Sequence, residues 1–182
     1  MNDVSSEIER LKQENHHIRG QIASYEAILR QVLWFGDYSF YSDNLVFDRT
    51  SLTIQCPATV TSPYCSVFLY IPITSISIRV LKGQACFGFI TLDQPIDLNR
   101  NLPYKQTHML WYDSVYVADG RLISECSFNI AAGCVTARYR PADHVISFQL
   151  DDNDPEDAFG NISENKLYPI ITMKKDTIVK IL

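Results

Sequence analysis

The sequence predicts a mainly β protein, an antiparallel β-sandwich preceded by a single coiled-coil α-helix. Residues 4–32 place apolar side chains at alternating spacings of four and three, which is the spacing of a heptad seam. The rest of the chain consists of short runs with a period of two between turn residues, and no second helical pattern follows. Of the 182 residues, 46% are apolar and 20% charged, a composition typical of globular proteins.

The first 34 residues are predicted to form a dimerisation helix. Its a and d positions are Val4, Ile8, Leu11, Asn15, Ile18, Ile22, Tyr25, Leu29 and Val32. In a parallel pair, Glu7 at a g position faces Lys12 at an e position of the second helix, and Glu14 faces Arg19 in the same way. Asn15 penalises shifted registers, because a misaligned second helix leaves its amide unpaired in an apolar seam. The sequence therefore predicts a parallel homodimer that presents the following domain in two copies.

Two alternatives to the parallel dimer stay open at this point. The repeat barely exceeds four heptads, so the helix can instead fold back on the C-terminal domain. Ile18 at a d position leaves room for a trimer. An antiparallel pair is disfavoured, because it loses both charge matches. Trp34, at the helix exit, is expected to pack between the helix and the sandwich.

Residues 36–182 are predicted to form the sandwich domain. Strands are expected at about 44–48, 51–56, 65–71, 74–81, 85–91, 110–117, 121–129, 133–140, 143–150, 167–173 and 177–181. The continuous apolar run 65–71 indicates a strand that is covered on both faces. Two long connections are expected, one from Asp93 to Met109, which holds two prolines, and one in the acidic run 151–157.

Several short runs in this domain follow a known pattern. They are Asn44 to Ile54, Phe87-Gly88-Phe89, Asp93 to Asp97, Gly133, Val145 to Phe148, Ala158 to Asn161 and Leu167 to Ile170. With these runs, residues 36–182 resemble the SPRY domain, a bent β-sandwich that serves as a protein-interaction module in many eukaryotic proteins. The resemblance implies a bent antiparallel sandwich that binds a protein or peptide partner through its loops.

Aromatic and basic residues beside the predicted loops are the candidates for that contact. Aromatic side chains near arginine or lysine make good anchors for a partner, and Tyr116 belongs to the same aromatic group. The predicted partner-binding residues are Tyr64, Arg100, Tyr104, Lys105, His108, Trp111, Tyr112 and Arg121.

Composition and motifs argue against several other functions. The net charge is −5, without a basic cluster after the helix, so nucleic acid is not an expected partner. No apolar run reaches the length of a membrane helix, so no membrane partner is expected. Catalytic motifs, metal-ligand spacings and cofactor fingerprints are not visible. We therefore expect a protein that is not an enzyme, with no catalytic, cofactor-binding or metal-binding residues.

The five cysteines indicate the redox environment of the protein. The cysteines are Cys56, Cys65, Cys86, Cys126 and Cys134. Their odd number and the lack of a secretory signal predict reduced thiols and a cytoplasmic or nuclear location.

Two other functions are kept as alternatives to the protein-binding module. The first alternative function is a lectin-like module in which Trp111 stacks on a sugar between His108, Asn99 and Arg100. The second is a scaffold subunit that assembles with copies of itself.

Overall fold

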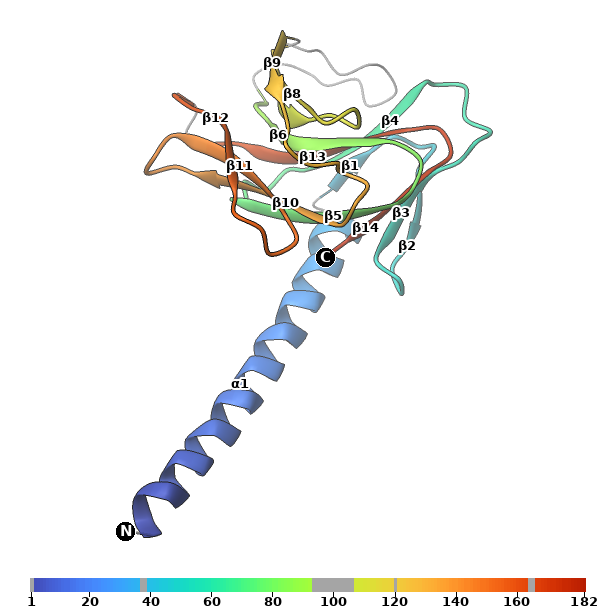
Figure 1. Cartoon of the computed structure of the whole chain (residues 1–182). Coiled ribbons are helices and arrows are strands. Elements are labelled where there is room, and N and C mark those ends of the chain that lie inside the picture. The colour runs from blue at the N-terminus through green and yellow to red at the C-terminus, as the bar shows by residue number, and fades with distance from the viewer. Residues whose placement is uncertain (1, 37–38, 93–106, 120, 164–165) are drawn as a thin grey trace.

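The computed structural model describes residues 2–36, 39–92, 107–119, 121–163 and 166–182. In these ranges the chain forms one α-helix and two seven-stranded antiparallel sheets. Figure 1 shows the sheets lying over one another and the helix projecting away from them, with the N-terminus at its far end. The predicted fold class, a mainly β sandwich with an N-terminal helix, is confirmed.

Helix α1 extends from Asn2 to Phe35. Its last two residues enter the sandwich, where Trp34 is 2% and Phe35 is 5% exposed. The Phe35 ring meets the Phe47 ring edge to face, with 5.7 Å between centroids. The predicted packing of Trp34 between helix and sandwich is confirmed, because it belongs to the main core cluster. Helix α1 ends at Phe35, and Gly36 follows it at a position where any Cβ would overlap the carbonyl oxygen of Val32.

The first sheet, called sheet A below, places a strand from near the C-terminus between two strands from the first half of the chain. Its order is β1 (Ser39–Tyr41), β4 (Tyr64–Leu69), β13 (Tyr168–Lys174), β6 (Ala85–Ile90), β7 (Thr107–Leu110), β8 (Val115–Ala118) and β9 (Arg121–Glu125). The central strand β13 pairs with both β4 and β6. Tyr64 is thereby placed opposite Lys174, a residue far away in the sequence.

The second sheet, sheet B, covers the inner face of sheet A. Its order is β12 (Glu156–Phe159), β11 (Val145–Leu150), β10 (Cys134–Arg140), β5 (Ser75–Lys82), β14 (Thr177–Ile181), β3 (Thr53–Cys56) and β2 (Val46–Asp48). The final hairpin β13–β14 therefore joins the two sheets, with β13 in sheet A and β14 in sheet B.

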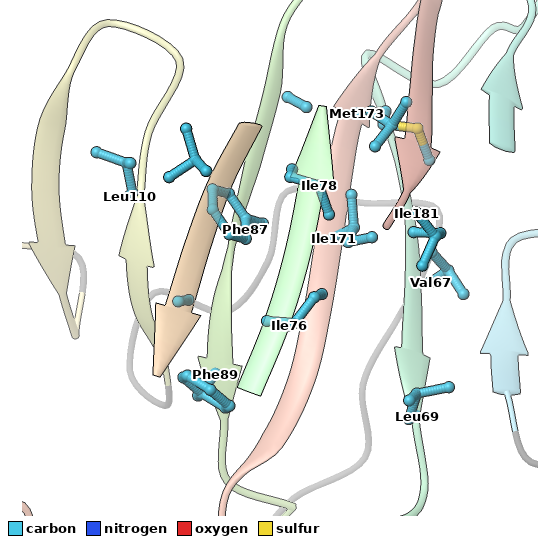
Figure 2. Packing of buried hydrophobic residues seen from close by; sticks show 14 of the residues in the cluster. Val67, Leu69, Ile76, Ile78, Phe87, Phe89, Leu110, Ile171, Met173 and Ile181 are labelled. Carbon is cyan, nitrogen blue, oxygen red and sulfur yellow. The ribbon is translucent and has the colours of Figure 1, made fainter. Parts of the chain in front are cut away.

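The core lies between the sheets because alternate residues of the strands point the same way. Phe87 and Phe89 of β6 are fully buried, and the Phe87 ring meets Phe148 of β11 edge to face at 5.7 Å. Figure 2 shows side chains from both sheets gathered in this layer. Its labelled members are Val67, Leu69, Ile76, Ile78, Phe87, Phe89, Leu110, Ile171, Met173 and Ile181.

A second buried cluster covers the outer face of sheet A. It contains Phe68, Cys86, Ile90, Met109 and Ile170, with the partly buried Leu92, Trp111, Tyr112 and Tyr168 packed against it. Strand β4 is consequently buried on both faces over Cys65–Leu69, as its continuous apolar run predicts.

The structure corrects several strand boundaries. The predicted single strand 110–117 is wrong, because Trp111–Ser114 form a turn that joins β7 to β8. Ser114 adopts a left-handed conformation with φ of 62°, and its backbone NH donates to the carbonyl of Trp111 at 3.0 Å. The predicted loop 93–109 is also too long at its C-terminal end, since residues 107–109 belong to β7. Residues 93–106 lie outside the described part of the chain.

Candidate functional site

The candidate helix interface is the apolar seam of α1. The predicted seam residues are exposed: Val4 68%, Ile8 48%, Leu11 50%, Ile18 53%, Ile22 51%, Tyr25 64%, Leu29 56% and Val32 45%. Asn15 is exposed as well. The alternative in which the seam packs on the chain's own sandwich is therefore excluded. Such an apolar stripe on a projecting helix is a surface that association would remove from water.

Within one chain, the charged residues beside the seam pair along the helix. Arg10 contacts the carboxylates of Glu7 at 2.6 Å and Glu14 at 2.8 Å, and Lys12 contacts Glu9 at 2.8 Å. The Arg10 guanidinium lowers the pKa of Glu7, and Glu7 in turn raises the pKa of Arg10. All of these side chains remain exposed, so they stay accessible to cations or anions of a second helix.

The second candidate site lies on sheet A, where Tyr64, Tyr112 and Lys174 form what we call the lysine–tyrosine cluster. The Lys174 ammonium lies 3.7 Å from the centroid of the Tyr112 ring and 6.0 Å from that of Tyr64. It donates a hydrogen bond of 2.8 Å to Gln84 Oε1. Register explains the contact with Tyr64, because Lys174 is paired with Tyr64 across β13 and β4. The Trp111 ring continues the aromatic surface, with 6.0 Å between its centroid and that of the Tyr112 ring.

A pocket of about 520 Å³ opens beside this cluster. It is bounded by three turns, which lie at residues 61–64, 83–84 and 174–176. Gly83 has a φ of 80°, and a Cβ there would lie 2.7 Å from the carbonyl oxygen of Asp176. Glycine therefore lets the β5–β6 and β13–β14 turns approach each other. Ser62 closes its own turn by donating to the carbonyl of Tyr64 at 2.6 Å.

The pocket carries an excess of positive charge. Lys174 and Lys175 both line it, whereas Asp176, the acid among the described lining residues, forms an ion pair of 2.7 Å with Lys82 outside the pocket. Below the cluster, burial raises the pKa of the Cys86 thiol to about 12. The thiol is therefore neutral at physiological pH. A cationic pocket with a tyrosine wall suits a carboxylate beside an apolar or aromatic group.

The predicted partner-binding residues divide among several places. Tyr64, Trp111 and Tyr112 meet on the outer face of sheet A. His108 is paired with the core residue Phe89, and its ring lies 5.2 Å from Phe159 of sheet B, so it points to the inner face. The remaining predicted residues are Arg121, exposed on strand β9, and Arg100, Tyr104 and Lys105, which lie outside the described residues.

These positions also affect the lectin hypothesis. His108 and Trp111 lie on opposite faces of sheet A, because Trp111 packs on the outer cluster. They cannot bracket one sugar ring together. Asn99 and Arg100 lie outside the described residues.

Tyr116 belongs to the buried core, although the sequence groups it with the aromatic residues beside the predicted loops. It is 2% exposed, and its hydroxyl donates to Glu156 Oε2 at 2.7 Å. Burial raises the pKa of Tyr116. Glu156 also accepts from the backbone NH of Ser127 at 3.2 Å, so it joins β8 of sheet A and the segment after β9 to β12 of sheet B.

The acidic run 151–157 also serves the fold. Asp151 Oδ1 accepts a hydrogen bond of 2.9 Å from the backbone NH of Cys134. Asp157 forms an ion pair of 2.9 Å with Arg140. Strand β12 then begins at Glu156, so the predicted loop is wrong in its last part. Within the described ranges, no group of three or more His, Cys, Asp or Glu side chains is arranged to hold a metal ion.

Sequence reasoning missed Lys174 and Gln84 as site residues. The run Lys174-Lys175-Asp176 has the composition of a turn, and its local sequence carries no sign of an aromatic neighbour. The missing signal is the pairing of β13 with β4, which a local pattern does not contain.

In the described segments, no helix has the length and apolar character needed to cross a membrane.

Comparison with known proteins shows the fold. The structure is similar to the SPRY domain of human HERC1, with 15% identity and a TM-score of 0.59 over 80% of this chain and 94% of that one. It is similar to the TRIM65 PSpry domain, with 10% identity and a TM-score of 0.59 over 85% and 97%. A human SPRY domain gives 11% identity and a TM-score of 0.56 over 78% and 96%. No family model matches the sequence, and no curated protein matches it. The predicted resemblance is thus confirmed as a likeness of structure: this chain has the SPRY fold, preceded by one long helix.

Proposed function

We propose that this protein is a non-enzymatic interaction adaptor, in which a parallel coiled-coil dimer displays two SPRY-like sandwiches that bind a protein or peptide partner. One observation carries the proposal. The helix projects from the sandwich (Figure 1), and its heptad seam is exposed along its whole length. A sandwich that needed the helix only for its own stability would cover that seam.

Association is the physical outcome that the seam favours. Each apolar seam residue exposes about half or more of its surface in the single chain, and burial of such surface stabilises by about 25 cal/mol per Å². The heptad spacing favours a second copy of the same helix as the occupant. Two linked sandwiches would then bind a clustered target with an avidity about 10² or more above that of one domain.

Sedimentation equilibrium tests the dimer directly. The full chain should give twice the mass of one 20.8 kDa chain. The double substitution of Leu11→Glu and Ile22→Glu introduces charge into the seam and should give monomers. Gln13→Glu with Ala23→Glu adds the same charge at exposed f and b positions on the outer face of the helix, so this matched control should remain dimeric. A wild-type chain that sediments as a monomer at all concentrations would remove the proposal.

For the partner, the lysine–tyrosine cluster and its pocket favour an acidic peptide segment. The supporting features are the two lysines at the pocket and the tyrosine rings around the Lys174 ammonium. Carboxylates gain charge-assisted hydrogen bonds from ammonium groups, and aromatic anchors contribute much of the energy at peptide-binding surfaces.

Selection from a random peptide library tests this partner chemistry. Peptides enriched on the wild-type protein should carry aspartate or glutamate and should be lost with Lys174→Gln. Lys166→Gln removes one exposed lysine outside the pocket and serves as the matched control. Equal enrichment of acidic peptides on both variants would show that the pocket is not the site.

A further inference from the structure

A groove of about 320 Å³ lies where the end of helix α1 meets sheet B. Leu29 and Leu33 line its helix side, and Ile73 and Ile181 line its sheet side. Ile181 is 2% exposed, whereas Leu29 at the rim is 56% exposed. The groove thus has an apolar floor, and its border on the helix combines the exposed Leu29 with the ion pair between Glu26 and Arg30.

The heptad register places this groove directly beside the seam. Leu29 is an a residue, and Glu26 and Leu33 are successive e residues. All three line the groove. The groove therefore follows the e side of the helix, which is the side that the g residues of a second parallel helix approach.

Ile28 is an exposed apolar residue of the helix that lies outside the a and d seam. It occupies a g position, and 53% of its surface is exposed. Since g and e positions flank the seam on opposite sides, Ile28 cannot reach the groove of its own chain. In a parallel dimer, a g residue meets the e residue that lies five positions later in the other chain. For Ile28 that residue is Leu33.

We propose that Ile28 of each protomer packs on Leu33 of the other at the open side of this groove, so that the dimer interface continues from the helices onto the sandwiches. The inference rests on the proposed parallel dimer and commits the groove to a second copy of this chain. Two-fold symmetry fills both grooves in the same way. The sandwiches would then be held in a fixed orientation at the end of the helix pair.

The charge pattern of the g and e positions supports this occupant. The same five-residue rule pairs Glu7 with Lys12 and Glu14 with Arg19, opposite charges that fit a second copy of the helix. The last such pair, Ile28 with Leu33, is apolar. The pair before it, Gln21 with Glu26, is polar. The side pairs thus change from oppositely charged at the free end of the helix to apolar at the last pair, beside which Ile73 and Ile181 supply further apolar surface.

Disulfide trapping between two variants tests this contact. Full-length Ile28→Cys and Leu33→Cys chains are mixed, allowed to exchange and oxidised with oxidised glutathione. Two thiolates then form one S–S bond, and glutathione accepts the electrons. A covalent dimer should form in the mixture and not in either variant alone. Ile28→Cys mixed with Gln31→Cys is the matched control, because residue 31 is a c position away from the seam.

Sedimentation of the same reduced proteins separates the two proposals. A dimer that cross-links through residues 28 and 33 supports both. A dimer without that cross-link, or one that cross-links equally with residue 31, overturns the groove contact and leaves the proposed dimer standing. A monomer overturns both.

A second measurement avoids the cysteines. Ile28→Ser removes the contact twice per dimer, so it should raise the dissociation constant by about tenfold or more. Ala23→Ser, at an exposed b position on the outer face, should leave the dissociation constant unchanged. Equal constants for the two variants would contradict the contact.

Discussion

The helix and the sandwich distribute their apolar residues in opposite ways. The sandwich buries Phe87, Phe89 and Phe148 almost completely, whereas the helix leaves Leu11 and Ile22 about half exposed. Both regions follow an equally regular sequence pattern. The difference shows that the sandwich forms its core within one chain, while the described part of the same chain leaves the apolar seam of the helix uncovered.

The two regions meet at one point, the end of α1. Trp34 and Phe35 belong to the core, yet Val32, only two residues earlier, is 45% exposed. Gln31 Nε2 adds a hydrogen bond of 3.5 Å to the carbonyl of Arg49. The helix is therefore anchored firmly by its last turn and is independent of the sandwich over most of its length.

The largest expected effect is the loss of a core ring. Phe87→Ala should lower the free energy of unfolding by about 3–5 kcal/mol, because it leaves a cavity between the sheets. Urea denaturation followed by near-ultraviolet circular dichroism measures it. Leu11→Ala on the helix is the contrasting variant, and it should change the unfolding of the sandwich by about 0.5 kcal/mol or less. Similar losses for both variants would show that the two regions fold as one unit.

The sequence predicts the bounds of the helix more accurately than the strands of the sandwich. The predicted end of the helix at residue 34 lies next to its observed end at Phe35, because a heptad repeat is a local signal that recurs over many turns. The sandwich strands follow from period two and turn residues. Two short strands escape this reasoning, β1 at Ser39–Tyr41 and β12 at Glu156–Phe159. Neither segment alternates apolar and polar residues over enough positions to show a period.

The errors have physical causes as well. The sequence predicts a strand through the turn after β7, because Trp111 and Tyr112 continue an apolar run, and only the left-handed Ser114 reveals the turn. The candidate site is predicted in part. Tyr64, Trp111 and Tyr112 can be selected as aromatics near loops, but Lys174 reaches them through strand register, which one sequence does not encode locally.

Another large effect is expected at alkaline pH, and it belongs to the sandwich alone. Burial raises the pKa of the Cys86 thiol to about 12, and burial together with Cys65 raises that of Cys56 to about 12, from an ordinary value of 9.0. The folded state therefore binds these protons more tightly than the unfolded chain. The resulting stability is complete below pH 9 and is lost as the pH rises toward 12.

Unfolding measured from about pH 8 to about pH 11 checks this expectation. The free energy of unfolding should fall above pH 9, by up to about 1.4 kcal/mol per pH unit for each buried thiol. Cys86→Ala should make the fall less steep, whatever its effect at neutral pH. A slope identical to that of the wild type would contradict a protonated, buried Cys86 thiol.

The smallest effect is expected on the exposed face of the helix. Arg10→Ala removes the intrahelical pairs with Glu7 and Glu14, which are fully exposed to solvent and stabilise the helix only weakly. Helicity should fall slightly, as far-ultraviolet circular dichroism can measure. The dimer should not weaken, because the two glutamates become fully available to Lys12 and Arg19 of the second helix. A dissociation constant that rises more than about tenfold would instead make Arg10 a member of the interface, which its c position in the heptad does not allow.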